Sequence, residues 1–336
     1  MSGSERMGMT TDDDWHWNHY WRADRMSACP ADGSTGNYVQ AIHSGWTAFF
    51  KAFPDGARLL DIGTGNGAIA AIAQATATAD GSHFEIHGVD RADIEPLRFV
   101  RTTPESLAAI HFHGRTPVES LPFPEDHFDG VSGQYALEYT DMPATVRELC
   151  RVAKPGARLR FVLHADGAAP VDGAVRNLQE IDFLTRKLEL PDKARALMCA
   201  VSAFERAAGY DALLENEARR ARQAYLSAAR QADAYYPEAK CKEIFSDLLG
   251  EVRRLWDHRQ ELTLDRILEI IDAIDTEVRA HEARLTGMRK VALSSAAVEK
   301  LAKRFRASGC TDIVLTELHP PEDPRFWGWE LTMEVN

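Results

Sequence analysis

The fold of this 336-residue chain is decided by the stretch LLDIGTGNG, which runs from Leu59 to Gly67. Its apolar start predicts a buried strand that ends near Ile62, and a helix is expected from about Ala68. The glycines between them allow a sharp turn and let a ligand lie against the main chain. Free N–H groups at the start of the helix would favour a polar or anionic group of that ligand. Alone, the loop also fits any tight strand-to-helix turn, or the nucleotide loop of a dehydrogenase.

Around this loop, short apolar runs alternate with helical patterns, which predicts βα units and a parallel sheet. Strands are expected at 57–62, 84–90, 109–113, 128–133, 157–164, 311–318 and 327–335. An amphipathic helix within 141–156 is expected to stop at Lys154-Pro155-Gly156, and a second helix over 294–309 is expected to end at Gly309. The pattern predicts a seven-stranded, mostly parallel α/β sheet with helices on both faces and an antiparallel last strand.

The region from about 167 to 290 has a different character, because it is poor in glycine and carries apolar residues at helical spacing. Leu264, Ile267, Leu268, Ile271 and Ile274 are the clearest example. We expect an all-helical subdomain inserted after the fifth strand, serving as a lid, in substrate recognition or in homodimerisation. The expected division is an N-terminal aromatic and helical cap (1–55), a ligand-binding core (56–166 and 291–336) and this insertion (167–290).

Composition narrows the class of partner. The net charge of -12 argues against nucleic acid, whose binding usually needs a basic face, and favours a small-molecule substrate. No apolar run approaches the ~20 residues of a membrane-spanning helix, and the first residues lack a signal-peptide pattern. Five scattered cysteines without a CxxC pair fit free thiols. We therefore expect a cytoplasmic protein with no membrane partner and no metal site.

Three features near the loop specify its ligand further. Asp61 stands directly before the first glycine, where a carboxylate could accept a hydrogen bond from an ammonium group or a bound water. Asp90 ends the second expected strand about 20 residues past the loop, where a ribose diol would lie. The segment PVESLPFPEDHFD, at 117–129, then runs into the fourth expected strand.

Together with VESLPFPEDHFDGVSG and RELCRVAKPGARLRFV, these pieces resemble the class I S-adenosylmethionine-dependent methyltransferases, in particular the ubiquinone-biosynthesis-like group of small-molecule enzymes. The resemblance extends over roughly 53–164 and resumes from about 294. It implies a Rossmann-like fold and S-adenosyl-L-methionine as cofactor. A dehydrogenase has no reason to carry the LPF…FD element or the KPG turn.

The resemblance also implies a set of cofactor-binding residues. Asp61, Gly63 and Gly65 would border the methionine and ribose, Asp90 would hold the ribose hydroxyls, and Glu119 would lie beside the adenine. Gly133 and Gln134 would form the floor under the sulfonium. The family often has an Asp or Thr where this chain has Pro117, so Thr116 or Glu119 would take the adenine contact. The full set is Asp61, Gly63, Thr64, Gly65, Asp90, Arg91, Thr116, Val118, Glu119, Gly133, Gln134, Tyr20 and Trp21.

Tyr20 and Trp21 belong to an aromatic segment, WHWNHYWRADR, that begins at Trp15. These rings could close over the cofactor and give its sulfonium a cation–π environment. They could equally belong to a helix that docks its apolar side on the core. Trp46 is expected in the core, near the site.

His164, His319 and Tyr135 are the candidate catalytic residues, with Glu138 and Tyr139 as further candidates for proton abstraction. His164 ends the fifth expected strand, Tyr135 follows the fourth and His319 follows the sixth, and ligands of open α/β sheets bind beyond the carboxyl ends of strands. A histidine could deprotonate a hydroxyl before methyl transfer, although either histidine could also be structural. Alignment of nucleophile, methyl group and leaving sulfur could supply most of the acceleration without a base.

The expected reaction is methyl transfer to an oxygen or nitrogen of a small, aromatic or otherwise apolar metabolite, with S-adenosylhomocysteine as product. The alternatives are methylation of a protein side chain or a carbon atom, an inactive cofactor-binding interaction protein, and a nicotinamide dehydrogenase.

Overall fold

The computed structural model describes residues 14–28, 37–38, 40–101, 104–320 and 323–336. It divides into two compact units. Met1–Asp172 and Gly287–Asn336 form the first, here called the sheet unit, and Gly173–Thr286 form the second, the helical unit.

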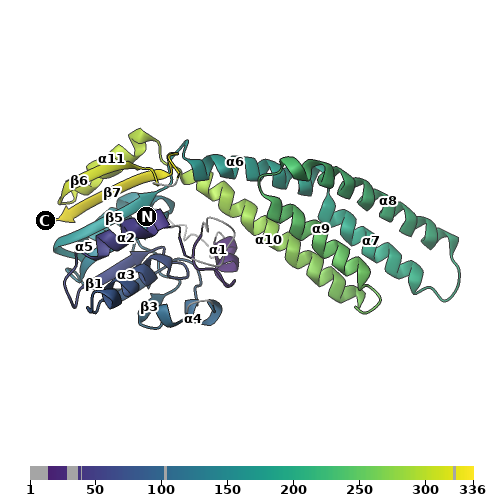
Figure 1. Cartoon of the computed structure of the whole chain (residues 1–336), viewed down its shortest axis with the longest axis horizontal. Helices are drawn as coiled ribbons and strands as arrows, with labels where there is room; N and C mark the ends of the chain where they lie inside the picture. The colour runs from purple at the N-terminus through teal and green to yellow at the C-terminus, as the bar shows by residue number, and fades with distance from the viewer. Residues whose placement is uncertain (1–13, 29–36, 39, 102–103, 321–322) are drawn as a thin grey trace, which may run out of the picture. The chain divides into compact units, whose positions relative to one another are not determined.

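The sheet unit contains the expected seven-stranded sheet, in the order β3-β2-β1-β4-β5-β7-β6 (Figure 1). β7 runs antiparallel to both of its neighbours, and the other pairs are parallel. This confirms the predicted fold class, including the antiparallel last strand. The strands are β1 (Arg58–Ile62), β2 (Glu85–Val89), β3 (Ile110–His113), β4 (Phe128–Gln134), β5 (Ala153–Leu163), β6 (Cys310–Leu318) and β7 (Gly328–Val335).

The start of β5 differs from the expectation. The preceding helix α5 ends at Val152, and Lys154-Pro155-Gly156 already belongs to the strand rather than to a turn before it. Phe128 of β4 pairs with Ala153, whereas Gly130 pairs with Arg158, so β5 carries extra residues at this point. Such a bulge tolerates a proline, which has no N–H to donate, and a glycine at φ +83°.

Helices cover both faces of the sheet (Figure 1). Trp46 and Phe50 of α2, with Ile69 and Ile72 of α3, share a core with Leu59 of β1. The next residue of that strand, Leu60, faces the opposite core, which includes residues of α5 and α11. The helices of this unit are α1 (Trp15–Tyr20), α2 (Gln40–Phe50), α3 (Ala68–Ala79), α4 (Pro96–Phe99), α5 (Met142–Val152) and α11 (Ser295–Ala307), with short 3-10 turns at Pro104–Ser106 and Leu137–Tyr139.

The helical unit is built from long amphipathic helices. Phe245, Leu248, Ile267 and Ile271 are among its buried side chains, in keeping with the spacing seen in the sequence. The chain enters this unit within α6 and leaves it within α10, so its limits fall inside helices instead of loops. Its helices are α6 (Ala169–Asp182), a π-helical turn (Phe183–Lys187), α7 (Leu190–Glu205), α8 (Ala212–Tyr235), a 3-10 turn (Tyr236–Glu238), α9 (Lys242–Asp257) and α10 (Leu264–Val291). Among the described residues, no helix combines the length and apolarity needed to cross a bilayer.

Candidate functional site

A pocket lies at the carboxyl ends of β1, β2 and β4. β1 lies between β2 and β4, so the strand order reverses here, and open α/β sheets bind ligands at such a point. The pocket is lined by Asp14, Trp17, Trp21, Met26, Ser27, Ala28, Tyr38, Asp61, Gly63, Thr64, Ala68, Ile69, Asp90, Arg91, Ala92, Val118, Glu119, Gln134, Tyr135, Ala136, Tyr139 and Thr140.

The glycine loop forms one wall of this pocket, and its glycines are required by both conformation and space. Gly63 has a φ of +58° and Gly65 a φ of +51°, in the left-handed region that favours glycine. A Cβ on Gly63 would lie 2.4 Å from the Cβ of Ala136, and one on Gly65 would lie 2.3 Å from the ring of Trp21. The loop therefore packs closely against its neighbours on both sides.

Two buried carboxyl groups stand at the strand ends beside this loop. Asp61 accepts a hydrogen bond from the Ser132 hydroxyl at 2.7 Å, and burial raises its pKa to about 7. Asp90 accepts from the N–H groups of Gly65 and Ala92, each at 2.8 Å, and burial raises its pKa to about 6. Both groups thus resist ionisation until a positive charge or further donors reach them.

The charge balance of the lining suits a cationic ligand. Asp14, Asp61, Asp90 and Glu119 contribute carboxyl groups, whereas Arg91 is the one Arg or Lys among the described residues of the lining. Arg91 is already paired with Asp14 at 2.6 Å. A sulfonium or an ammonium group would therefore enter a region with an excess of acidic groups.

Gln134, the last residue of β4, offers a donor to the pocket. Its Oε1 accepts a hydrogen bond from the buried Trp46 indole N–H at 2.7 Å. Its Nε2 is also buried and has no partner among the described residues. A ligand oxygen would satisfy this donor, which would otherwise carry a desolvation cost.

Aromatic side chains from the N-terminal segment form a second wall. Trp17 and Trp21 stack with centroids 5.9 Å apart at 14°, and Trp17 meets the edge of Tyr139 at 6.1 Å. Tyr20 lies outside the lining, because its hydroxyl donates to the carbonyl of Ser27 at 2.9 Å. The segment thus packs on the core and lines the pocket at once, which combines the two interpretations of its sequence.

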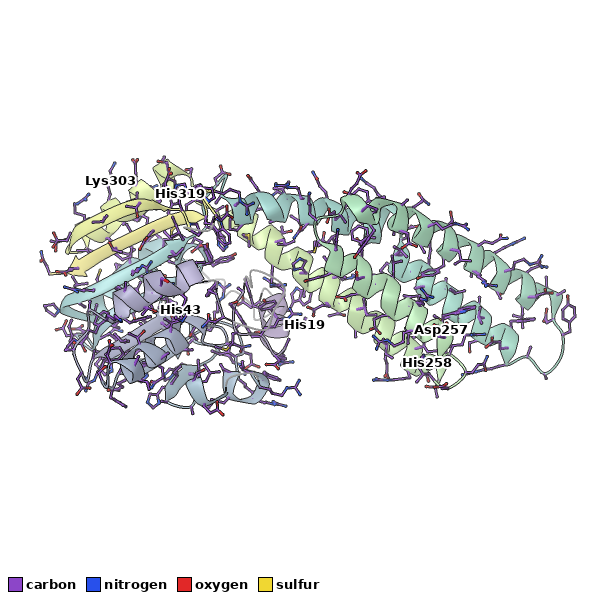
Figure 2. The ribbon with its side chains drawn as sticks, viewed as in Figure 1. His19, His43, Asp257, His258, Lys303 and His319 are labelled. Atoms are coloured by element: carbon purple, nitrogen blue, oxygen red, sulfur yellow. The ribbon has the colours of Figure 1, made fainter. Side chains whose placement is uncertain are left out.

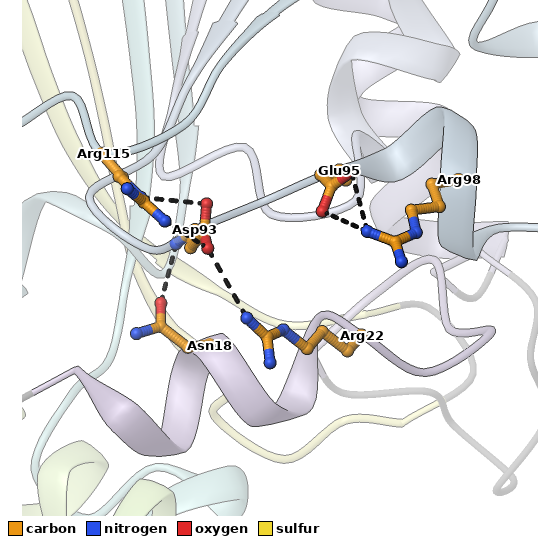
Figure 3. A network of polar contacts seen from close by, with 6 residues as sticks. All are labelled: Asn18, Arg22, Asp93, Glu95, Arg98 and Arg115. Atoms are coloured by element: carbon orange, nitrogen blue, oxygen red, sulfur yellow. Dashed lines mark hydrogen bonds and ion pairs between the residues drawn. The ribbon is translucent and has the colours of Figure 1, made fainter.

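Polar contacts fix this segment to the loop after β2, as Figure 3 shows. The Asp93 N–H donates to the side-chain oxygen of Asn18 at 2.7 Å. The Asp93 carboxylate pairs with Arg22 at 3.6 Å and with Arg115 at 2.8 Å. These groups join α1 to the end of the strand that carries Asp90.

A buried asparagine joins the same segment to the glycine loop. Asn66 is fully buried, and its Nδ2 donates to the carbonyls of Trp21 at 3.1 Å and Arg25 at 2.7 Å. The residue before Gly67 thus holds the turn after α1 against the start of α3.

Tyr135 connects the pocket to a buried pair of titratable residues. Its ring lines the pocket and stacks on His164 with centroids 4.1 Å apart at 21°. His164 Nδ1 is hydrogen-bonded to Glu138 Oε1 at 2.7 Å, while His164 Nε2 and Glu138 Oε2 have no partner among the described residues. His164 itself does not line the pocket, so it lies one ring behind it.

His319 is placed away from this pocket. It follows β6, the edge strand, which is three strands from β4 and so about 14 Å across the sheet. There it is exposed, as labelled in Figure 2. Its ring contacts Glu317 and Phe326. The expectation failed because the antiparallel β7 lies between β5 and β6, which an ordering by sequence does not reveal.

The structure brings most of the predicted site residues together. Those that line the pocket are Asp61, Gly63, Thr64, Asp90, Arg91, Val118, Glu119, Gln134, Trp21 and Tyr135, whereas Gly65, Thr116, Gly133, Tyr20, His164 and His319 do not. A Cβ on Gly133 would instead meet Ile62 and Phe161 within the sheet, and the Thr116 hydroxyl donates to the carbonyl of Gly114. Tyr38, Met26, Ala136 and Thr140 line the pocket without any sequence motif to indicate it.

Comparison with known proteins agrees with this geometry. Residues 60–161 match the family model described as a methyltransferase domain. The 2-phytyl-1,4-naphtoquinone methyltransferase of Synechococcus elongatus is 31% identical over 134 residues, 39% of this chain and 55% of that protein. The ubiquinone/menaquinone biosynthesis C-methyltransferase UbiE of Xanthomonas campestris is 32% identical over 125 residues, 36% of this chain and 49% of that protein.

The chain spans about half the length of these curated relatives. Among solved structures, the YcgJ protein from Bacillus subtilis is 29% identical with a TM-score of 0.32, over 41% of this chain and 58% of that one. The matched family model, the strand order and the acidic pocket at the glycine loop agree with one another. Residues 60–161 therefore form a methyltransferase domain of the class I S-adenosylmethionine-dependent type, and the cofactor of this domain is S-adenosyl-L-methionine.

Proposed function

We propose that this chain transfers the methyl group of S-adenosylmethionine to an oxygen or nitrogen of a small aromatic or otherwise apolar molecule, with S-adenosylhomocysteine as product. The observation that carries the proposal is an acidic pocket at the glycine loop whose other wall is aromatic. The cofactor supplies a methyl group already activated on a positively charged sulfur. The protein then has to hold that sulfur and an acceptor atom in line.

The groups in the pocket suit the cofactor one by one. The Asp61 carboxylate would accept from the ammonium group, and the Asp90 carboxylate from the ribose hydroxyls. The Nε2 of Gln134 would donate to a carboxylate oxygen of the methionine part. Glu119 lines the pocket whereas Thr116 does not, which favours Glu119 for the adenine contact.

The rings of Trp17, Tyr38, Tyr135 and Tyr139 would stack with a planar acceptor. Tyr135 and Tyr139 are the candidates for proton abstraction that line the pocket, and either would have to be in its phenolate form to take the proton of an acceptor hydroxyl. His164 acts on Tyr135 from behind, as a positioning residue held by Glu138.

Methylation of a ring carbon is the second candidate. One curated relative is a 2-phytyl-1,4-naphtoquinone methyltransferase, and another is the ubiquinone/menaquinone biosynthesis C-methyltransferase UbiE. A quinol ring would stack on the same aromatic wall as a phenol, so the wall supports both acceptors.

A labelled-methyl assay distinguishes these reactions. The full chain is incubated with S-adenosylmethionine and with phenols, aromatic amines, carboxylates or quinols, and S-adenosylhomocysteine is quantified while NMR locates the transferred methyl. Label on oxygen or nitrogen supports the first proposal, and label on carbon supports the second. Bound cofactor without product from any acceptor class would instead indicate an inactive binding protein.

We also propose that the helical unit contributes to acceptor recognition or to a homodimer contact. Its exposed Tyr210, Leu213 and Leu226 are large apolar side chains, which a partner surface could cover. Sedimentation velocity of the full chain and of Leu213→Ser tests the second role. A dimer that persists in the variant would remove Leu213 from any such contact.

A further inference from the structure

A cluster of imidazole rings lies on one face of β3, an edge strand of the sheet, and of β2 beside it. Glu85 and His87 share one face of β2, because side chains alternate along a strand. His87 pairs in register with His111 of β3, and their rings stack 4.9 Å apart. His127, which directly precedes β4, meets His87 with ring centroids 6.3 Å apart.

Three of these side chains have ligand atoms close enough to share one metal ion. One ligand atom each from Glu85, His87 and His127 lies within 4.8 Å of the others. Glu85 Oε1 and His87 Nε2 are 3.2 Å apart. Tetrahedral zinc, with ligands about 2.1 Å away, places its ligand atoms roughly 3.4 Å apart. Small side-chain rotations would therefore complete the site.

Neighbouring groups already orient the first two ligands as in known metal sites. His87 Nδ1 is hydrogen-bonded to His113 Nε2 at 3.0 Å, which directs the other ring nitrogen of His87 toward Glu85. Arg58 donates to Glu85 Oε2 at 3.0 Å and leaves Oε1 on the side of His87. Metal-bound histidines usually donate their second N–H, and bound carboxylates are usually hydrogen-bonded in turn.

The third ligand is positioned by an aromatic contact. The Phe123 ring stacks on His127 at 5.8 Å and 9°, and its edge meets His87 at 5.1 Å. The His87 side chain is 12% exposed and that of Glu85 is 41% exposed, so an ion can reach the cluster from solvent. Two imidazole nitrogens and one carboxylate oxygen form a donor set that suits zinc among the divalent metals.

We propose that Glu85, His87 and His127 bind one Zn²⁺ ion, with a water molecule in the remaining coordination position. The ion would join β2 to the segment that leads into β4. Glu85 and His87 lie about 16 Å and about 10 Å from Asp90 along the strand, and none of the three proposed ligands lines the methyl-donor pocket. The proposed site is therefore separate from the methyl-donor pocket.

The test uses the full chain after treatment with a chelator, titrated with ZnCl₂ by calorimetry. One ion per chain is expected to bind, and its binding should raise the melting temperature. His127→Ala should abolish this event, and His113→Phe should weaken it about 10- to 100-fold, because His113 orients a ligand. His83→Ala, at an exposed histidine before β2, is the matched control and should bind zinc as the parent does.

Two readouts make the outcome decisive. S-adenosylmethionine binding to His127→Ala should be unchanged, which shows that the variant is folded and separates this proposal from the proposed function. Replacement of zinc by Co²⁺ should give a visible absorption band typical of a four-coordinate site. Absence of saturable zinc binding would overturn the proposal, as would equal zinc affinity in His127→Ala and the parent.

Discussion

The affinity for S-adenosylmethionine should fall steeply as the pH drops from 7.0 to 5.5. Burial raises the pKa of Asp61 to about 7 and that of Asp90 to about 6, and the ligand requires both as carboxylates. Asp61 would then be about 50% ionised at pH 7.0 but about 3% at pH 5.5, an effect of about 16-fold. Asp90 adds about 4-fold, so the dissociation constant should rise about 60-fold.

Among the described residues, the other charged groups that line the pocket with Asp61 are Asp90, Glu119 and the Arg91–Asp14 pair. The pKa of the cofactor's own α-amino group, about 7.7–8.0, lies above this range.

Calorimetry at several pH values measures this effect, with buffers of different ionisation enthalpy to count released protons. In Asp61→Asn the position is neutral at every pH, so the affinity should be lower and its remaining change should shrink to the 4-fold contribution of Asp90. Asp80→Ala, at the exposed end of α3, should retain the full change of the parent. A flat affinity between pH 5.5 and 7.0, or an unchanged slope in Asp61→Asn, would refute the reasoning.

Three further predictions concern stability and the aromatic segment. Folding raises the pKa of Asp61 and Asp90 above the ordinary 3.8, so their contributions to apo stability are complete below that value and are lost as pH rises through about 7 and about 6. Urea unfolding should show a loss of about 4 kcal/mol between pH 5 and 8, of which about 2.6 kcal/mol comes from Asp61 and about 1.4 kcal/mol from Asp90. Asp61→Asn should leave only the Asp90 contribution, and an unreduced loss in this variant would contradict the prediction. Gly65→Ala should displace the Trp21 ring and shift its fluorescence, because the added Cβ would meet that ring. Gly81→Ala is the control, since Gly81 also has a positive φ but has open space around it, and it should cost only about 1–2 kcal/mol of backbone strain. An unshifted spectrum in Gly65→Ala would count against the close packing of Trp21 on Gly65. Asn66→Ala removes the hydrogen bond to the Trp21 carbonyl, so it should lower the free energy of unfolding by about 1–3 kcal/mol and speed amide exchange around residue 21. Unchanged exchange would show that Asn66 does not hold the turn after α1.

The sheet could be predicted from sequence because its strands are short apolar runs bounded by strong turn signals. The Leu59–Gly67 stretch fixed both the first strand and the start of α3. The bulge in β5 could not be predicted in the same way. A Pro-Gly pair signals a turn in any sequence, and only the pairing of β4 with both Ala153 and Arg158 shows that it lies within a strand.

Three residues that line the pocket, Asp61, Gly63 and Asp90, could also be predicted from the sequence, because they lie in one short run of motifs. Contacts between segments far apart in the chain cannot be predicted in this way, because no motif in the sequence marks them. Trp46 and Gln134 are 88 positions apart yet share a hydrogen bond. The sequence analysis expected His319 near the other candidate catalytic residues for a related reason. Its distance from the pocket depends on which strand lies beside β5, and the sequence does not show that this strand is β7.

The antiparallel strand β7 has a consequence for synthesis on the ribosome. β5 ends at Leu163, but β7, which completes its hydrogen bonding on one side, begins only at Gly328, about 165 residues later. At roughly 5–20 residues per second, translation takes about 8–33 s to cover this interval. During that time the nascent sheet presents an unpaired edge, the kind of surface that chaperones bind and that aggregates form on. The helical unit is made entirely within this interval, so its length sets how long the growing chain remains vulnerable.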